Sequence, residues 1–122
     1  MSEAGPSILH ICSREMILGL RDQILRVHGY QVDSTLDSAV ALELSRRRAY
    51  DLVVIDVEGD GRIALAEELC QQLKEQRAGQ DVVFICNYRV SQETDCPDEV
   101  IRAEFNPKAM VAGIEDFLRK RD

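Results

Sequence analysis

The segment DVEGDGRIALAE, residues 56–67, carries oxygen-bearing side chains at the spacing used by calcium loops. Asp56, Glu58 and Asp60 stand at its first, third and fifth positions. Gly61 stands at the sixth position and a glutamate at the twelfth, which is the pattern of an EF-hand loop. An EF-hand loop follows a helix, however, whereas apolar β-type residues precede Asp56. We therefore expect no calcium site, and we expect Asp60 to cap the helix that follows.

Asp56 has a second interpretation, because it ends the apolar run YDLVVID. A carboxylate presented in this way can act as a nucleophile toward a phosphoryl group. Phosphoryl transfer is catalysed by positioning and by charge neutralisation. Whether Asp56 can accept a phosphoryl group therefore depends on the residues at the ends of the neighbouring strands. These residues are Cys12, Ser13 and Cys86. The simpler alternative is that Asp56 only bonds the adjacent main chain.

Short apolar runs alternate along the chain with longer amphipathic stretches. This alternation predicts parallel βαβ units with right-handed crossovers, which form an open, doubly wound α/β sheet. Chemistry in such sheets lies at the carboxyl ends of the strands. Ile17, Leu20, Ile24 and Val27 are predicted to form the buried face of the first helix. The predicted strands are 7–12, 30–34, 52–57, 82–86 and 99–103, and the predicted helices are 15–28, 37–48, 63–76 and a last one opened by Asn106 and Pro107.

Length and composition indicate a single domain, residues 1–122, with a flexible N-terminus at residues 1–6. The formal net charge of −7 argues against direct nucleic-acid binding, because an acidic chain gains nothing from counterion release. No apolar stretch is long enough to cross a membrane, and the N-terminus lacks the features of a signal peptide. We therefore expect a cytoplasmic protein.

The four cysteines form no CxxC pair and show no zinc-ligand spacing. Cys12 and Cys86 are expected to be small buried residues, and a redox pair or soft-metal site formed by these two is the alternative. Cys96 lies in a polar segment beside Pro97 and is the best candidate for a reactive thiol. His10, inside the first strand, is expected to be a core histidine with its hydrogen bonds satisfied.

Two segments, DSAVALELSRRRAYDLVVID at 37–56 and FNPKAM at 105–110, resemble the response-regulator receiver domains of two-component signalling. The resemblance extends over residues 8–118. It implies a flavodoxin-like, five-stranded parallel sheet of order 2-1-3-4-5 with helices on both faces. The segment NYRVSQETDCPD, residues 87–98, is short and polar, so the helix between the fourth and fifth strands is predicted to be short or missing.

The resemblance also implies a set of site positions, of which this chain keeps one. Asp56 stands in the position of the phosphoacceptor. Cys12 and Ser13 replace the acidic pair that holds Mg²⁺ in the family. Cys86 stands where the family has Ser or Thr, and Ala103 stands where it has the phosphate-binding Lys. Glu58, in the loop after Asp56, is a further position at which the site is degenerate.

A phosphoryl group carries about −1.5 to −2 charges at neutral pH, and this chain lacks the family's means of balancing them. Arg14 and Arg102 are near in sequence, but alternation along the strand turns Arg102 away from the Lys position. The sequence therefore predicts a pseudo-receiver that is not an enzyme, has weak or no Mg²⁺ binding, and acts by protein–protein interaction. Its partner is an unidentified signalling protein or a second copy of the chain. Two alternatives stay open: a receiver still phosphorylated on Asp56 with weak Mg²⁺ dependence, and a redox or small-ligand sensor using Cys12 and Cys86.

Overall fold

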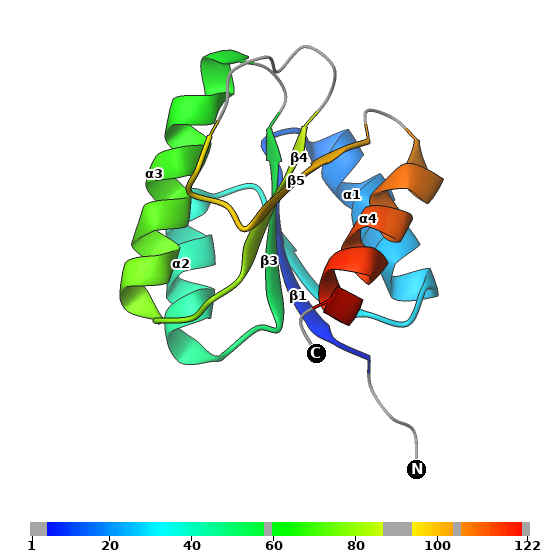
Figure 1. The fold of residues 1–122 in the computed structure, drawn as a ribbon, viewed down its shortest axis with the longest axis horizontal. Helices are drawn as coiled ribbons and strands as arrows, with labels where there is room; N and C mark the ends of the chain where they lie inside the picture. Colours follow the sequence, from blue (N-terminus) through cyan, green and yellow to red (C-terminus); the bar gives the residue numbers. More distant parts are fainter. Residues whose placement is uncertain (1–4, 58–59, 87–93, 104–105, 121–122) are drawn as a thin grey trace.

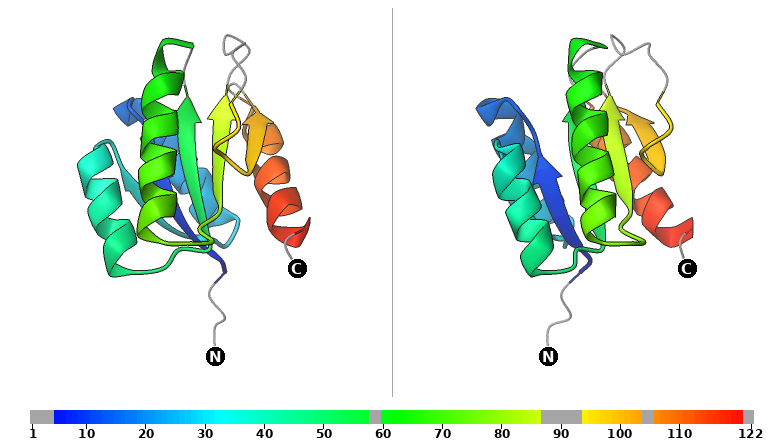
Figure 2. Two further views of the ribbon diagram at one scale, coloured as in Figure 1. Left: turned by 60° about the vertical axis from the view of Figure 1, so that its left-hand side comes forward. Right: turned by 90° about the vertical axis from the view of Figure 1, so that its left-hand side faces the viewer.

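The computed structural model describes residues 5–57, 60–86, 94–103 and 106–120, which form a five-stranded parallel sheet with helices on both faces (Figure 1). The strand order is β2-β1-β3-β4-β5, as predicted. Helices α2 and α3 cover one face, and α1 and α4 cover the other (Figure 2). The strands are β1 (Ser7–Ile11), β2 (Gln31–Thr35), β3 (Leu52–Val57), β4 (Val82–Cys86) and β5 (Glu99–Arg102), and the helices are α1 (Glu15–Val27), α2 (Ser38–Arg47), α3 (Asp60–Gln76) and α4 (Pro107–Lys120).

The three central strands are apolar along almost their whole length because helices cover them on both faces. Phe84 and Leu73 lie in the core beneath α2 and α3, and Ile8 and Met110 lie in the core beneath α1 and α4. Parallel pairing places residue 10 opposite residue 54 and residue 56 opposite residue 85. This register fixes which side chains meet at the carboxyl ends of the strands.

The position at which helix α3 begins tests the interpretation of residues 56–67 as a calcium loop. Helix α3 begins at Asp60, three residues before the predicted start at Ile63. The second half of the supposed calcium loop is therefore helical, and strand β3 precedes it. This geometry contradicts an EF-hand loop, and Asp60 opens the helix as its first residue. The predicted cap of the last helix is confirmed, since Asn106 Oδ1 accepts hydrogen bonds from the main-chain N–H groups of Lys108 (3.0 Å) and Ala109 (3.2 Å).

The buried face predicted for α1 was wrong in part, since Ile17 and Ile24 are half-buried and Ile24 packs against the core, but the other two residues are exposed. Leu20 is 57% exposed and Val27 is 77% exposed, whereas Leu25 is fully buried. Arg21 and Asp22 turn toward the sheet and are only partly exposed. They lie there because polar side chains of β1, β2 and β3 provide partners for them, which a hydrophobic pattern alone does not show.

The ends of the sheet are held by main-chain contacts. The amide N–H of Gln31 donates to the carbonyl of Pro6 (3.0 Å), and its side chain donates to the carbonyl of Gly5 (3.1 Å). Residues 5 and 6 are thus held against β2, although the sequence placed them in a flexible N-terminus. Of the segment 87–98, where the helix was predicted to be short or missing, residues 87–93 lie outside the described ranges, and residues 94–98 form no helix. None of the helices in the described ranges has the length and apolarity required to cross a membrane.

Tyr50 is expected to make stability depend on pH in the alkaline range. Its hydroxyl donates a 2.7 Å hydrogen bond to Asp33, and its side chain is nearly buried. Burial, followed by the bond to Asp33, raises the pKa of Tyr50 to about 12. Because this folded-state pKa lies above the unfolded value of about 10, the contribution is complete below pH 10 and is lost as the pH rises toward 12.

Tyr50→Phe should therefore lower the free energy of unfolding by about 1–2 kcal/mol at pH 7. The variant should also lose less stability than the wild type between pH 10 and 12. Urea unfolding at a series of pH values measures both effects. Parallel stability curves for the two proteins across this range would count against the assignment.

Candidate functional site

Asp56 lies near the carboxyl end of β3, two residues after Val54, and alternation along the strand places it on the same face as Val54, which is covered by α1 and α4. His10 of β1 pairs in register with Val54, so His10 and Asp56 lie on the same face of adjacent strands. His10 Nε2 is 2.7 Å from Asp56 Oδ2, and His10 is fully buried. The Asp56 side chain itself is only 4% exposed. The expected phosphoacceptor position is thus an interior position.

Arg21 of α1 contacts the other oxygen of the same carboxylate. Its Nε lies 3.1 Å from Asp56 Oδ1, and its side chain is 12% exposed. Its Nη1 lies 3.1 Å from the sulfur of Met110 on α4. Each oxygen of Asp56 therefore has a nitrogen partner, one from β1 and one from α1. Buried carboxylates require such partners because desolvation of an unpaired charge is costly.

A second layer of polar groups fixes the orientation of His10. His10 Nδ1 is 3.3 Å from Ser34 Oγ, and Ser34 donates a 2.6 Å hydrogen bond to Asp22. Arg26 donates to the other oxygen of Asp22 at 2.7 Å. Burial raises the pKa of Asp22, but hydrogen bonds from Arg26 and Ser34 outweigh it and leave that pKa below its usual value.

This network gives each nitrogen of the His10 ring a polar partner. Ser34 has a single hydroxyl proton, and it is donated to the ionised Asp22. A lone pair of Ser34 Oγ then remains to accept a hydrogen bond from His10 Nδ1, 3.3 Å away. The 2.7 Å contact on the other side of the ring also needs a proton between His10 Nε2 and Asp56 Oδ2. Asp56 consequently shares a proton with His10 while it faces the Arg21 guanidinium.

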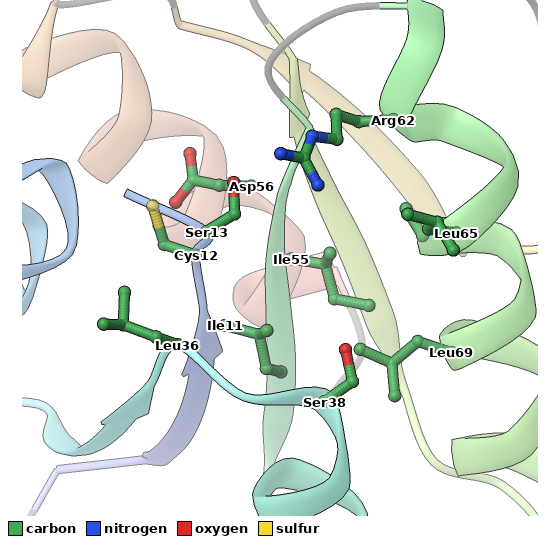
Figure 3. Close-up of a pocket in the computed structure, with 11 residues that line it drawn as sticks. Ile11, Cys12, Ser13, Leu36, Ser38, Ile55, Asp56, Arg62, Leu65 and Leu69 are labelled. Atoms are coloured by element: carbon green, nitrogen blue, oxygen red, sulfur yellow. The ribbon is translucent and has the colours of Figure 1, made fainter. Parts of the chain in front are cut away.

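A pocket of about 140 Å³ adjoins Asp56 at the carboxyl ends of β1 and β3, next to α3 (Figure 3). Cys12 and Ser13 line it from the end of β1, and Arg62 extends from α3 toward the end of β3 (Figure 3). Cys12 is 1% exposed, whereas Ser13 is exposed. The volume is below the roughly 300 Å³ at which ligand pockets usually begin, so the space fits a small anion and not a nucleotide.

The remaining predicted positions lie on both sides of this site. Cys86 is 1% exposed at the end of β4 and packs in the core beneath α2 and α3. Ala103 is buried directly after β5, and its N–H donates to the carbonyl of Cys86 at 3.2 Å. Arg102 is exposed, in agreement with the predicted alternation. Glu58 lies outside the described residues.

The topology separates the two cysteines that the sequence suggested as a redox pair. Strand β3 runs between the ends of β1 and β4, so Cys12 and Cys86 are two strand spacings apart. Two spacings amount to about 10 Å, beyond the ~7 Å limit for the Cα atoms of a disulfide. Within the described part of the chain, no group of three or more His, Cys, Asp or Glu side chains is placed to hold a metal ion.

His10 is the satisfied core histidine that the sequence predicted, but its partner Asp56 was not foreseen. The contacts described for Asp56 are to side chains of β1 and α1, not to the adjacent main chain as expected. Arg21 was missed entirely. A signal for it exists in the sequence, because Arg21 stands three residues after Leu18 and four before Leu25, in the register of the helix face that meets the sheet.

Comparisons with known proteins place this geometry in a fold class. No family model and no curated protein matches the chain. Solved structures do match, and a CheY-like receiver domain from Methanospirillum hungatei aligns with 94% of this chain and 94% of its own at 19% identity and a TM-score of 0.76. The chain therefore has the fold of response-regulator receiver domains.

Two further structures show how widely this fold is shared. HP1043, an orphan response regulator of H. pylori, is 22% identical, with a TM-score of 0.74 over 96% of this chain and 99% of its own. The chemotaxis response regulator CheY4 of Vibrio cholerae is 15% identical, with a TM-score of 0.72 over 91% of this chain and 97% of its own. The fold is thus similar over nearly the full length, while the sequences have diverged far.

Proposed function

We propose that this chain is a signal-transduction module with a receiver fold that acts by binding another protein, without phosphorylation of Asp56. The observation that carries the proposal is the burial of Asp56 between His10 and Arg21. In this arrangement the carboxylate stabilises the packing of α1 on the sheet. The receiver fold supports the signalling role, and the partner is a signalling protein or a second copy of the chain.

The geometry around Asp56 opposes its use as a nucleophile. A carboxylate oxygen must approach phosphorus in line with the leaving group, with its lone pair free. Here Oδ2 shares a proton with His10, and Oδ1 faces the Arg21 guanidinium 3.1 Å away. Both contacts withdraw electron density from the oxygens, and the side chain is only 4% exposed.

The composition of the neighbouring positions also opposes phosphorylation. Mg²⁺ prefers oxygen ligands in an octahedral arrangement, whereas Cys12 offers a buried sulfur and Ser13 a neutral hydroxyl. Ala103 offers no cation for the phosphate, and Cys86 is buried in the core. Arg62 is the cation lining the adjoining pocket. Arg21 is already paired with the Asp56 carboxylate, and Arg62 without Mg²⁺ balances only part of the charge of about −1.5 to −2 on a phosphoryl group.

An exposed apolar stripe on α1 supports binding to another protein. Met16, Leu20 and Val27 are 79%, 57% and 77% exposed, and their spacing of four and seven residues aligns them along one side of the helix. Large exposed apolar side chains on one side of a helix are found at protein-binding surfaces. The stripe lies on the opposite side of α1 from Leu25 and Arg21, so a partner would dock without disturbing the Asp56 contacts.

Phosphoryl incorporation tests the proposal. The wild-type protein is incubated with acetyl phosphate and Mg²⁺, and its intact mass is measured beside that of the Asp56→Asn variant. We expect no added phosphoryl group on either protein. A phosphoryl group that appears on the wild type and is absent from Asp56→Asn would show that Asp56 is a working phosphoacceptor. A group that appears on both would lie at another residue and would leave the proposal standing.

A further inference from the structure

Cys70 of α3 and Cys96, in the segment that leads into β5, lie next to each other. Their sulfur atoms are 2.6 Å apart, close to the ~2.0 Å of a disulfide bond. Cys70 is fully buried, and Cys96 is partly exposed. The sequence had indicated Cys96 as a reactive thiol but had not paired it with Cys70. We propose that Cys70 and Cys96 form a reversible disulfide that fastens the segment 94–98 to α3.

Contacts on both sides of the two cysteines join α3 to the segment 94–98. Thr94 donates a hydrogen bond to Glu67, and Lys74 forms a 2.8 Å ion pair with Asp98. Glu67, Cys70 and Lys74 share one side of α3, at spacings of three and four residues. Their partners are alternate residues of the other segment, so the thiols are brought together by contacts on either side of them.

Asp98 anchors the far end of this line to the sheet. Its carboxylate accepts the N–H of Val82 at 2.8 Å, and its own N–H donates to the carbonyl of Val82 at 2.7 Å. Cys96 packs against the same core that contains Cys70. Closing the gap from 2.6 Å to the ~2.0 Å of a disulfide bond needs a movement of a few tenths of an ångström in each sulfur.

The chemistry requires an oxidant, and a small-molecule disulfide such as oxidised glutathione supplies it. The thiolate of Cys96, the more accessible sulfur, attacks one sulfur of the reagent, forms a mixed disulfide and releases one glutathione thiolate. Cys70 then attacks the sulfur of Cys96, its proton passes to the second glutathione thiolate as this leaves, and the intramolecular disulfide is complete. The two cysteines lose two electrons in total, and the reagent is reduced to two thiols.

The environment of Cys70 sets the order and speed of these steps. Burial, followed by the hydrogen bond with Cys96 and the charge of that sulfur, raises the pKa of the Cys70 thiol well above its usual value. Cys70 therefore stays protonated until the mixed disulfide has formed beside it. The charge of Lys74, one turn along α3, lowers the pKa of Cys70 and so favours its thiolate. Reduction by excess thiol reverses the sequence.

Thiol counting on the full chain tests the inference. After incubation with oxidised glutathione and removal of the reagent, the unfolded protein should show two free thiols instead of four. Peptide mapping without reductant should recover one crosslink, joining Cys70 to Cys96 within a single chain. Because the bond closes a loop between residues 26 apart, the Tm of the oxidised protein should rise by roughly 10 °C.

Two variants make the outcome decisive. Cys96→Ala should keep all three of its remaining thiols, because Cys70 is buried away from the reagent and the variant lacks the thiol beside it. Cys12→Ala, which removes another buried cysteine, should still lose two thiols and show the same crosslink. The inference is overturned if the wild type keeps four thiols, or if the crosslinks join different chains or other cysteines. The mapping of the wild type settles the matter even if a variant fails to fold.

Discussion

Replacing Asp56 with asparagine is expected to lower the free energy of unfolding by about 3 kcal/mol, because it removes one partner from a buried ion pair. The asparagine side chain would retain the shape of the aspartate but would leave the Arg21 guanidinium facing a neutral amide. The cost lies at the lower end of the range for such pairs, since Arg21 is 12% exposed and can reach water in part.

Urea unfolding of the variant and the wild type at pH 7 measures this difference. Asp116→Asn is the matched control, because Asp116 is 47% exposed and solvent screens its surface ion pairs, so its replacement should change stability little. The sign of the change in unfolding free energy distinguishes a structural ion pair from a Mg²⁺-binding carboxylate. A carboxylate placed among other carboxylates to bind Mg²⁺ suffers repulsion, and its neutralisation relieves that repulsion. Unchanged or increased stability of Asp56→Asn would therefore contradict a structural role for the pair.

The second large effect is a rescue. The double variant Asp56→Asn, Arg21→Met is expected to be about 2 kcal/mol more stable than Asp56→Asn alone. Methionine fills the space of the arginine stem and removes the charge that had lost its partner. The amide oxygen of the introduced asparagine can still accept the hydrogen bond from His10 Nε2. No charged group from the pair is then left desolvated.

A double-mutant cycle built from the wild type, the two single variants and the double variant measures this coupling directly. We expect the two single losses to sum to clearly more than the loss in the double variant. Strictly additive losses would mean that Asp56 and Arg21 do not interact in solution. The cycle is sound only if all four proteins unfold in a single cooperative step with the same denaturant dependence.

The fold could be predicted because its signals are local. Strand β4 is an unbroken apolar run and β3 is apolar except for Asp56, and the alternation of strands and helices restricts their order to few possibilities. The cap at Asn106 could also be predicted, because a capping residue acts within three positions of itself. Each of these features follows from a short stretch of chain and its own backbone chemistry.

The candidate site could be predicted only in part because its contacts are distant in sequence. Asp56 and the replacements at Cys12 and Ala103 are visible from position alone. The contact with His10 spans 46 residues, and its recognition requires the exact register of β1 against β3. Arg21 occupies the inward face of α1, where a hydrophobic pattern places apolar residues by default. The pairing of buried polar groups overrode that pattern.

The central claim is that the phosphorylation site of the receiver fold has become a structural ion pair in this chain. An amide NMR titration with Mg²⁺ and then with beryllofluoride, a mimic of the aspartyl phosphate, tests it most directly. We predict that the resonances of Cys12, Asp56 and Cys86 stay within their linewidths at saturating concentrations of both reagents. Shifts at these residues that saturate with the reagents would show that Asp56 leaves His10 and Arg21 to bind the phosphate mimic, and would contradict the claim.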